Sequence, residues 1–527
     1  MTSFLSRLSP VPGFPAYTGP YKVGTIDVEL PVSELESLSP CPDETIGTIQ
    51  YRIFYPCEPE SKGKTVNWVP APQRQTLAAY GRFLGAGNKL AEFISFFPRI
   101  FHYIQIPASK NAPLLSPPTT NNRWPVMIFS HGLGGSRNAY SHLAGSIASH
   151  GMIVIAPEHR DGSTVISFIR SVPSPTPTST EEKITTSKQK RTTDYVRLEH
   201  VFKPEVEEGR NKQLKIRLWE LGLVHSSLLA LDKETPLTNL NTSSTSLSPF
   251  ASKMDIHEPG KIAFSGHSFG AATITQLIKS TFYQPDSTTP SSYKPIFTPS
   301  SNSPIRLQIT SQTPVILLDV WNLPLSGNSV SWLWNKPFPC YTPTGPGGSA
   351  LLAIESEAFF KWRVHLKMTK RLLSRDPSSL VPLPAEPERE QPHFYYANTS
   401  AHLSQSDFGM LFPWVTKRFL AIEEPERIMR LNVRAITQLL RDRGIEVSKT
   451  SHEDMEYEDP NAEATNKDDK IFRRGSVRGW EWISTDISEM MDIDEQESMR
   501  SGAIADVKGD KGAMKEAKET VDGIEVS

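Results

Sequence analysis

The chain has 527 residues and is 38% apolar, which is enough for a large buried core. Its 56 basic and 58 acidic residues give a net charge of −2. This sum hides an uneven distribution: residues 452–527 hold 21 acidic and 10 basic residues, a net charge of −11, so residues 1–451 carry +9. The three cysteines lie far apart, which argues against a disulfide scaffold and a cysteine-based zinc site.

No run of 18 or more uncharged apolar residues occurs, so we expect no membrane-spanning helix. Pro and Gly interrupt the first residues of the chain, which is not typical of a secretory signal. With the unpaired cysteines, this predicts an intracellular, cytoplasmic location that allows peripheral contact with membranes.

Apolar patterns predict a mostly parallel central sheet flanked by helices, an α/β fold. The segments 26–32 and 47–56 alternate apolar and polar residues, which is typical of antiparallel strands. Short apolar runs predict buried strands at 125–132, 151–158, 261–265, 314–321, 350–356 and 393–399. Helical spacing over 136–150 joins two of these strands in a βαβ unit, and another long helix is expected over 205–232.

Three segments rich in Ser, Thr and Pro, at 163–197, 234–250 and 284–305, are predicted to be exposed insertions. From about residue 450 the composition becomes charged and poor in aromatic residues, which is typical of disorder. We therefore predict one catalytic domain over 1–450, with its core at about 20–430, and a charged, disordered tail over 451–527.

The strongest local motif is GHSFG at 266–270, which fits the G-x-S-x-G nucleophile elbow. It follows an apolar strand and opens an apolar helix, as the elbow requires, so Ser268 is the candidate nucleophile. The helix N-terminus favours negative charge at this place.

A serine nucleophile needs a base, which follows an acid in the order Ser, Asp or Glu, His in this fold. His452 lies in the charged tail, and His365 lies in a basic helical stretch where we expect a surface residue. His402 lies on a loop after the late strand 393–399, so we prefer it to His393, which is read as the start of that strand.

Asp319 ends the apolar run 315–318, at the place from which side chains reach the active edge of an α/β sheet. We predict that it orients the base, with Glu357 as the second candidate. The oxyanion of acyl transfer needs backbone donors. We expect these from the N–H groups of Phe269, directly after the nucleophile, and of Leu133 in the HGLGG loop at 131–135.

Three segments resemble the plasma and type II intracellular platelet-activating-factor acetylhydrolases, in the same order as in that family. They are FSHGLGGSRNAYSHLAGSIASHGMIVIAPEHRDGS (129–163), GHSFGAAT (266–273) and LLDVWNLPL (317–325), and the resemblance covers roughly residues 20–430. These proteins are calcium-independent α/β-hydrolases, also called group VII phospholipases A2. The resemblance implies the same residues for the nucleophile, acid, base and oxyanion donors, and an Asp-Phe pair, Asp407-Phe408, after the base.

The chain departs from the family in its longer insertions, in the diverged strand before His402 and in its acidic tail. The resemblance implies an esterase that hydrolyses a short or oxidised sn-2 acyl chain of phospholipids (1-alkyl-2-acetylglycerophosphocholine esterase type). No cofactor, metal or nucleic-acid partner is expected. Two alternatives stay open: a carboxylesterase or lipase for uncharged esters, and a catalytically silent binding protein with a hydrolase fold.

Two further features concern regulation and membranes. The stretch 78–106 holds a broken helical pattern of apolar residues, among them Phe93, Phe96, Phe97, Ile100 and Phe101. These residues form either a patch that docks on phospholipid or part of the core. In the tail, RRGSV at 473–477 is a basic-directed kinase pattern, which makes Ser476 a candidate phosphorylation site.

Overall fold

The computed structural model describes residues 11–96, 99–172, 190–201, 203–341, 348–378, 391–420, 422–458 and 468–487. The strands are β1 (Val23–Pro31), β2 (Thr48–Pro56), β3 (Thr65–Asn67), β4 (Gln105–Lys110), β5 (Trp124–Ser130), β6 (Ile153–Glu158), β7 (Ile166–Arg170), β8 (Lys190–Asp194), β9 (Met254–Asp255), β10 (Ile262–His267), β11 (Val315–Leu318), β12 (Leu351–Ser356), β13 (His393–Ala397) and β14 (Trp480–Trp482).

The α-helices are α2 (Gln73–Phe83), α3 (Asn88–Ile94), α4 (Ser141–Ser149), α6 (Pro204–Asp232), α7 (Phe269–Phe282), α8 (Pro304–Gln308), α9 (Ser331–Trp334), α10 (Glu357–Lys361), α11 (Arg363–Leu373), α12 (Asp407–Leu411), α13 (Pro413–Leu420), α14 (Pro425–Asp442) and α15 (His452–Glu458). The 3₁₀ helices are η1 (Val32–Glu34), η2 (Arg99–Tyr103), η3 (Ser248–Phe250), η4 (Leu323–Leu325), η5 (Pro339–Tyr341), η7 (His402–Gln405) and η8 (Asp468–Phe472).

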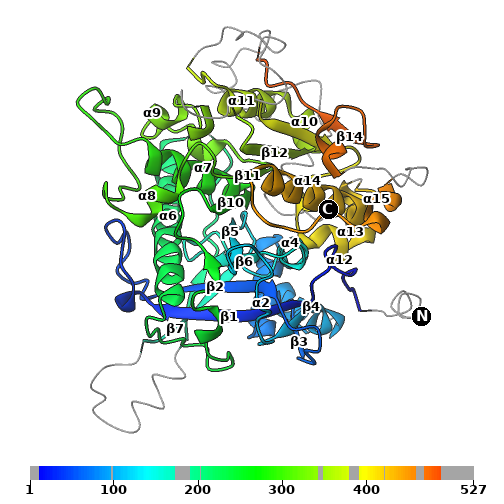
Figure 1. Cartoon of the computed structure of the whole chain (residues 1–527). Helices are drawn as coiled ribbons and strands as arrows, with labels where there is room; N and C mark the ends of the chain where they lie inside the picture. Colours follow the sequence, from blue (N-terminus) through cyan, green and yellow to red (C-terminus); the bar gives the residue numbers. More distant parts are fainter. Residues whose placement is uncertain are drawn as a thin grey trace, which may run out of the picture.

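One large sheet crosses the molecule in the order β14-β13-β12-β11-β10-β5-β6-β2-β1-β4-β3 (Figure 1). The six strands from β13 to β6 are parallel to one another, while β2 is antiparallel to both β6 and β1. Every residue of β5, β6 and β10 is buried, as expected for parallel strands covered on both faces. The predicted α/β-hydrolase architecture is confirmed.

Helices cover both faces of the sheet. In Figure 1, α6, α7 and α8 lie on one side of the strands, and α4, α14 and α15 lie on the other. The buried apolar residues accordingly form two large clusters: one includes the inner faces of α6 and α7, and the other those of α4 and α14. The sheet therefore separates two cores, and the loops at the carboxyl ends of its parallel strands are held from both sides.

The prediction of a disordered tail from residue 451 is wrong for residues 468–487. There β14 pairs antiparallel with β13, the indole of Trp480 is 2% exposed and Ile471 is fully buried. The averaged composition hid these apolar residues, which are few and widely spaced. The packed structure therefore continues past the predicted boundary at 450, while residues 459–467 and 488–527 lie outside the described residues.

The insertion expected at 163–197 is also not uniformly exposed. Its two ends pair as the antiparallel strands β7 and β8, and Val165 and Ile166 are buried.

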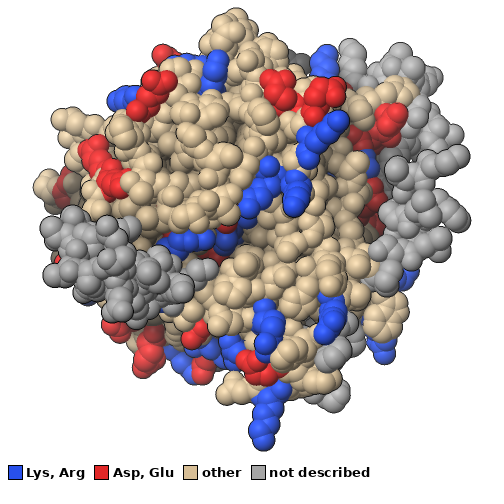
Figure 2. Space-filling view, turned by 90° about the horizontal axis from the view of Figure 1, so that it is seen from below, with Lys and Arg blue, Asp and Glu red and all other residues tan. Residues whose placement is uncertain are grey.

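A band of Lys and Arg side chains crosses the face of the molecule seen from below (Figure 2). The described helices include none with both the length and the hydropathy needed to cross a bilayer.

Candidate active site

Ser268 occupies a strained turn between β10 and α7. Its backbone has φ 56° and ψ −119°, outside the regions that suit L-residues, and its N–H donates to the carbonyl of Leu318 at 2.9 Å. Glycines flank this turn because other residues do not fit. A Cβ on Gly270 would lie 2.0 Å from the carbonyl oxygen of Ser130, and one on Gly266 would lie 2.5 Å from the backbone of Gly270.

The predicted acid and base are in direct contact. His402 Nδ1 donates to Asp319 Oδ2 at 3.0 Å, and the other carboxylate oxygen accepts the Ser356 N–H at 2.5 Å. Asp319 is fully buried directly after β11, whereas His402 follows β13 at the start of η7. Because carboxyl ends of parallel strands meet at one edge of a sheet, these two side chains lie at the same edge as Ser268.

Two rings enclose the imidazole of His402. The ring of Phe359 stacks on the His402 imidazole at a centroid distance of 4.6 Å and an interplanar angle of 4°. The ring of His267 lies with its centroid 4.3 Å from that of His402. Together with the Asp319 hydrogen bond, these contacts fix the orientation of the ring. His267, Asp319 and His402 also place three potential metal-ligand atoms within 4.8 Å of one another in the described part of the chain. The acid–base hydrogen bond accounts for much of this closeness.

The HGLGG loop lies directly against the nucleophile. A Cβ on Gly132 would lie 3.0 Å from the Cβ of Ser268, so a larger residue here would press against the nucleophile. In the described residues, the N–H groups of Leu133 and Phe269 donate to no protein acceptor, while Gly134 N–H is already bonded to Ser163. Phe269 begins the 14-residue helix α7 directly after Ser268, and Leu133 follows Gly132; their role as oxyanion donors stays a prediction.

A buried ion pair between Arg217 and Asp161 holds the HGLGG loop through a hydrogen bond to its first residue, His131. Arg217 of α6 binds Asp161 at 2.7 Å and donates to the carbonyl of His131 at 2.8 Å, and it also donates to Thr273 Oγ1 of α7 at 3.3 Å. Arg217 and Asp161 come from the long helix and from the EHRD segment, which sequence analysis had used only for the family resemblance.

Glu355 is a site residue that sequence reasoning missed. It follows Ile354 in β12, whose carbonyl accepts the Asp319 N–H at 2.9 Å, and it is 1% exposed. Burial, followed by the charge of Asp319, raises the pKa of Glu355 well above its ordinary value. Burial beside the Asp319 carboxylate therefore favours the protonated form of Glu355. The pairing of β11 with β12 creates this neighbour, so no local motif could have indicated it.

The other candidate bases and the second acid lie elsewhere. His365 is 3% exposed, so the prediction of a surface position is wrong: its ring packs against Phe359 and Trp362. His393 begins β13, as predicted, and stacks on Phe472. Glu357 forms an ion pair with Lys361 at 2.6 Å on α10 rather than contacting the base.

The candidate membrane residues divide into two groups. Phe93 is 61% and Phe96 45% exposed, whereas Phe97 lies outside the described residues. For Phe101 the structure favours the core alternative: it is partly buried, packs against the apolar cluster that includes α4 and α14, and contacts the ring of Phe412 at 5.6 Å. Ile100 is only half-buried.

Ser476 is exposed in the turn between η8 and β14, and its N–H donates to the Arg473 carbonyl at 3.1 Å. Its phosphorylation stays a prediction.

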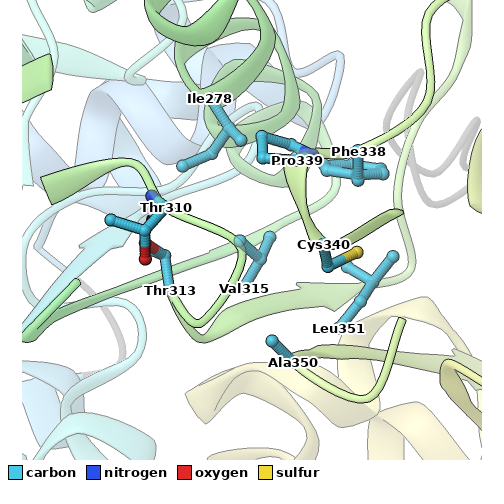
Figure 3. Close-up of a pocket in the computed structure, with 9 residues that line it drawn as sticks. All are labelled: Ile278, Thr310, Thr313, Val315, Phe338, Pro339, Cys340, Ala350 and Leu351. Atoms are coloured by element: carbon cyan, nitrogen blue, oxygen red, sulfur yellow. Dashed lines mark hydrogen bonds between the residues drawn. The ribbon is translucent and has the colours of Figure 1, made fainter. Parts of the chain in front are cut away.

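A small cavity lies at the opposite edge of the sheet from the candidate site (Figure 3). Its lining includes Val315 and Leu351, the first residues of β11 and β12, together with Ile278 and Cys340. Because Asp319 follows the other end of β11, this cavity is not part of the candidate active site. It has room for about one water molecule.

The fold and the comparisons with known proteins together define a carboxylic ester hydrolase with an α/β-hydrolase fold. The chain belongs to the family described as "Platelet-activating factor acetylhydrolase, isoform II", whose model matches residues 8–467. This confirms the family expected from the three sequence segments.

Individual relatives are more distant. A Schizosaccharomyces pombe protein named "Putative phospholipase A2" is 28% identical over 460 residues, which cover 82% of this chain and 92% of that protein. The platelet-activating factor acetylhydrolase of Canis lupus familiaris is 29% identical, over 43% of this chain and 46% of its own length. Among solved structures, a ferulic acid esterase from Streptomyces cinnamoneus has a TM-score of 0.43 at 15% identity, covering 84% of this chain and 97% of its own.

Proposed function

We propose that the protein hydrolyses phospholipid esters with a Ser268–His402–Asp319 triad. The hydrogen bond between His402 and Asp319, at the sheet edge where Ser268 occupies its strained turn, is the observation that carries this proposal. His159, which follows β6 at the same edge, also has an acid partner, Glu220 at 2.8 Å, but its Nε2 is engaged by the hydroxyl of Ser130 at 2.9 Å.

In the proposed reaction, His402 Nε2 takes the hydroxyl proton of Ser268 as the serine oxygen attacks the ester carbonyl. Asp319 holds the imidazole through Nδ1 and stabilises the imidazolium that forms, without itself becoming protonated. The N–H groups of Leu133 and Phe269 bind the developing oxyanion. His402 then protonates the leaving alcohol, and water attacks the acyl-enzyme with His402 as base.

The family and the names of its relatives support a phospholipid with a short or oxidised sn-2 acyl chain as substrate. The acid released would be acetate or a similar short acid. Hydrolysis of uncharged esters alone, such as p-nitrophenyl or triacylglycerol esters, is the alternative that a substrate panel separates.

Labelling with a fluorophosphonate probe tests the nucleophile. Wild-type protein should be labelled and should hydrolyse short-chain phosphatidylcholine, and Ser268→Ala should lose labelling and at least ~10³-fold in kcat. Ser265→Ala is a matched control, because Ser265 is a buried serine of β10, the strand that precedes Ser268, and its hydroxyl has no partner in the described residues. If Ser268→Ala retains labelling, the assignment of Ser268 is wrong.

We also propose that the substrate is reached from a lipid surface through an apolar patch next to the site. Most of the exposed large apolar side chains lie in two segments, α2 to η2 and α13: Leu84, Leu90, Phe93, Phe96, Tyr103, Trp414 and Val415. The contact of Phe101 with Phe412 joins these segments, and α13 follows the His402 loop in sequence. Exposed aromatic rings of this kind suit the headgroup region of a bilayer.

A further inference from the structure

The hydroxyl of Tyr140 contacts two of the loops that form the candidate site. Gly132 N–H donates to Tyr140 Oη at 3.2 Å, and Tyr140 Oη lies 2.7 Å from His267 Nδ1. The ring is 6% exposed and packs against Phe129 and His267, at centroid distances of 5.0 and 5.4 Å. One buried hydroxyl thus connects the loop before Leu133 with the residue before Ser268.

A neutral His267 ring has one nitrogen free to accept a hydrogen bond. Burial, followed by the charge of His402, holds the pKa of His267 well below its ordinary value, so this ring is neutral. Burial likewise raises the pKa of Tyr140, which keeps its hydroxyl protonated. Because Gly132 N–H donates to Tyr140 Oη, the hydroxyl proton needs a different partner as acceptor, and His267 Nδ1 is that acceptor in the tautomer that carries its proton on Nε2.

Each of these two partners touches a reacting group of the proposed mechanism. Gly132 lies against the Cβ of Ser268 and precedes Leu133, the second oxyanion donor. His267 precedes Ser268, and its ring lies 4.3 Å from that of His402. A shift of the Tyr140 hydroxyl would move the oxyanion donor Leu133 together with the His267 ring that packs against the base, His402.

Tyr140 is itself held firmly at the N-terminus of α4. The carboxylate of Asp407 accepts the N–H groups of Ser141 and His142 at 2.9 and 3.0 Å, and the Ser141 hydroxyl at 2.6 Å. Asp407 also receives the indole N–H of Trp68 at 2.9 Å, and its own N–H donates to the Ala139 carbonyl at 2.9 Å. The chain on both sides of Tyr140 is thus fixed to the element that follows the His402 loop.

We propose that Tyr140 is a positioning residue that holds the oxyanion loop and the nucleophile elbow in register through its hydroxyl. The hydroxyl touches no reacting atom in this arrangement, so its effect is on geometry. This inference rests on the proposed function of Ser268 and His402. Loss of the hydroxyl should therefore weaken transition-state binding and leave substrate binding largely unchanged.

Tyr140→Phe tests this inference, because it removes only the hydroxyl. With short-chain phosphatidylcholine below its micellar concentration, we expect kcat to fall about 10- to 100-fold, less than for complete loss of an oxyanion donor, with KM within about twofold of wild type. Tyr51→Phe is the matched control: Tyr51 is fully buried in β2, and its hydroxyl pairs with Ser227 at 3.1 Å. Tyr51→Phe should leave kcat unchanged, while it lowers the melting temperature about as much as Tyr140→Phe does.

A second variant, His267→Leu, removes the acceptor of the same hydrogen bond. The kcat losses of Tyr140→Phe and His267→Leu should not add in the double variant, because both changes break one chain of contacts. Unchanged kcat in Tyr140→Phe, or fully additive losses, would overturn the inference. If Ser268→Ala is inactive while Tyr140→Phe keeps full activity, only the role of Tyr140 fails; if Ser268→Ala stays active, the proposed function itself fails.

Discussion

Glu220 and His159 form a buried pair behind the oxyanion loop, and their protonation differs from that of an ion pair. His159 Nδ1 lies 2.8 Å from Glu220 Oε2, and His159 Nε2 lies 2.9 Å from the hydroxyl of Ser130. Burial, with the charge of Asp161, raises the pKa of Glu220 to about 8, and burial with Arg217 holds that of His159 well below its ordinary value. These shifts favour the uncharged form of both groups at neutral pH, with the protonated Glu220 Oε2 donating a hydrogen bond to His159 Nδ1.

This pair makes stability depend on pH in a predictable direction. The pKa of Glu220 is higher in the folded protein than its ordinary value of 4.5, so its contribution is complete below about pH 4.5 and is lost as pH rises through 8. Glu220→Gln keeps the donor and the acceptor without a titrating proton. Between pH 5 and 8, the free energy of unfolding of wild type should fall relative to this variant, by at most ~1.4 kcal/mol per pH unit.

Urea unfolding at pH 5, 6.5 and 8 measures this difference. Glu208→Gln, on an exposed part of the same helix, controls for the loss of one acidic group. A difference between wild type and Glu220→Gln that does not vary with pH would show that Glu220 is ionised in the folded protein.

At this scale, the sequence was most informative where the chemistry is local. The elbow at Ser268 and the loop at Leu133 need glycines at fixed spacing, so a motif reveals them. His402 and Asp319 were inferred from their order and from strand ends, and they prove to be hydrogen-bonded to each other. Glu355 and Tyr140 had no such signal, because their partners come from strands and loops that only the folded sheet brings together.

At the scale of elements, the buried parallel strands were predicted well because both of their faces are covered, which leaves continuous apolar runs. The bounds of α6 (Pro204–Asp232) also agree closely with the predicted 205–232. Strands β7, β8 and β14 were missed, since short strands at an edge or in a hairpin carry little apolar pattern. For Phe101 the sequence left the membrane patch and the core open, because its partner, Phe412, is distant in sequence.

The apolar patch of the two segments, α2 to η2 and α13, yields a prediction at this scale. Phe93→Ser, Phe96→Ser and Trp414→Ala each remove an exposed aromatic ring, and burying such a side chain is worth ~1.5–3 kcal/mol. Each change should therefore weaken partition onto phosphatidylcholine vesicles about 10-fold or more, as measured by co-sedimentation. Hydrolysis of a soluble short-chain ester should not change.

Leu307→Ser is the control for this set, since Leu307 is 58% exposed on α8, outside both segments. Equal vesicle binding by all variants and by wild type would show that these rings do not contact lipid.

At the scale of the whole molecule, the near-zero net charge is the sum of a basic part and an acidic part. The structure shifts the boundary between these parts toward the C-terminus. Residues 468–487 belong to the packed structure: Ile483 N–H donates to the Phe394 carbonyl at 2.8 Å, and Asp468 pairs with Arg441 at 2.7 Å. The remaining segment 488–527 still holds 11 acidic and 5 basic residues, a net charge of −6. Its charge opposes that of the basic surface seen in Figure 2.

Two truncations separate the structural and the electrostatic roles of this region. Removal of 452–527 deletes β14 with the buried side chains of Ile471, Trp480 and Ile483, and it exposes the edge of β13. Since each buried apolar side chain contributes ~1.5–3 kcal/mol, this variant should lose several kcal/mol of unfolding free energy or aggregate. Removal of 488–527 should leave the urea midpoint unchanged.

The shorter truncation should also bind anionic vesicles more tightly than the full chain, because it removes a net charge of −6 that competes for the basic surface. The gain should shrink as salt is raised from 50 to 300 mM, since screening weakens both interactions. Binding to purely zwitterionic vesicles controls for apolar contacts and should not change. Equal binding of both chains to anionic vesicles at low salt would show that the acidic segment does not compete for this surface.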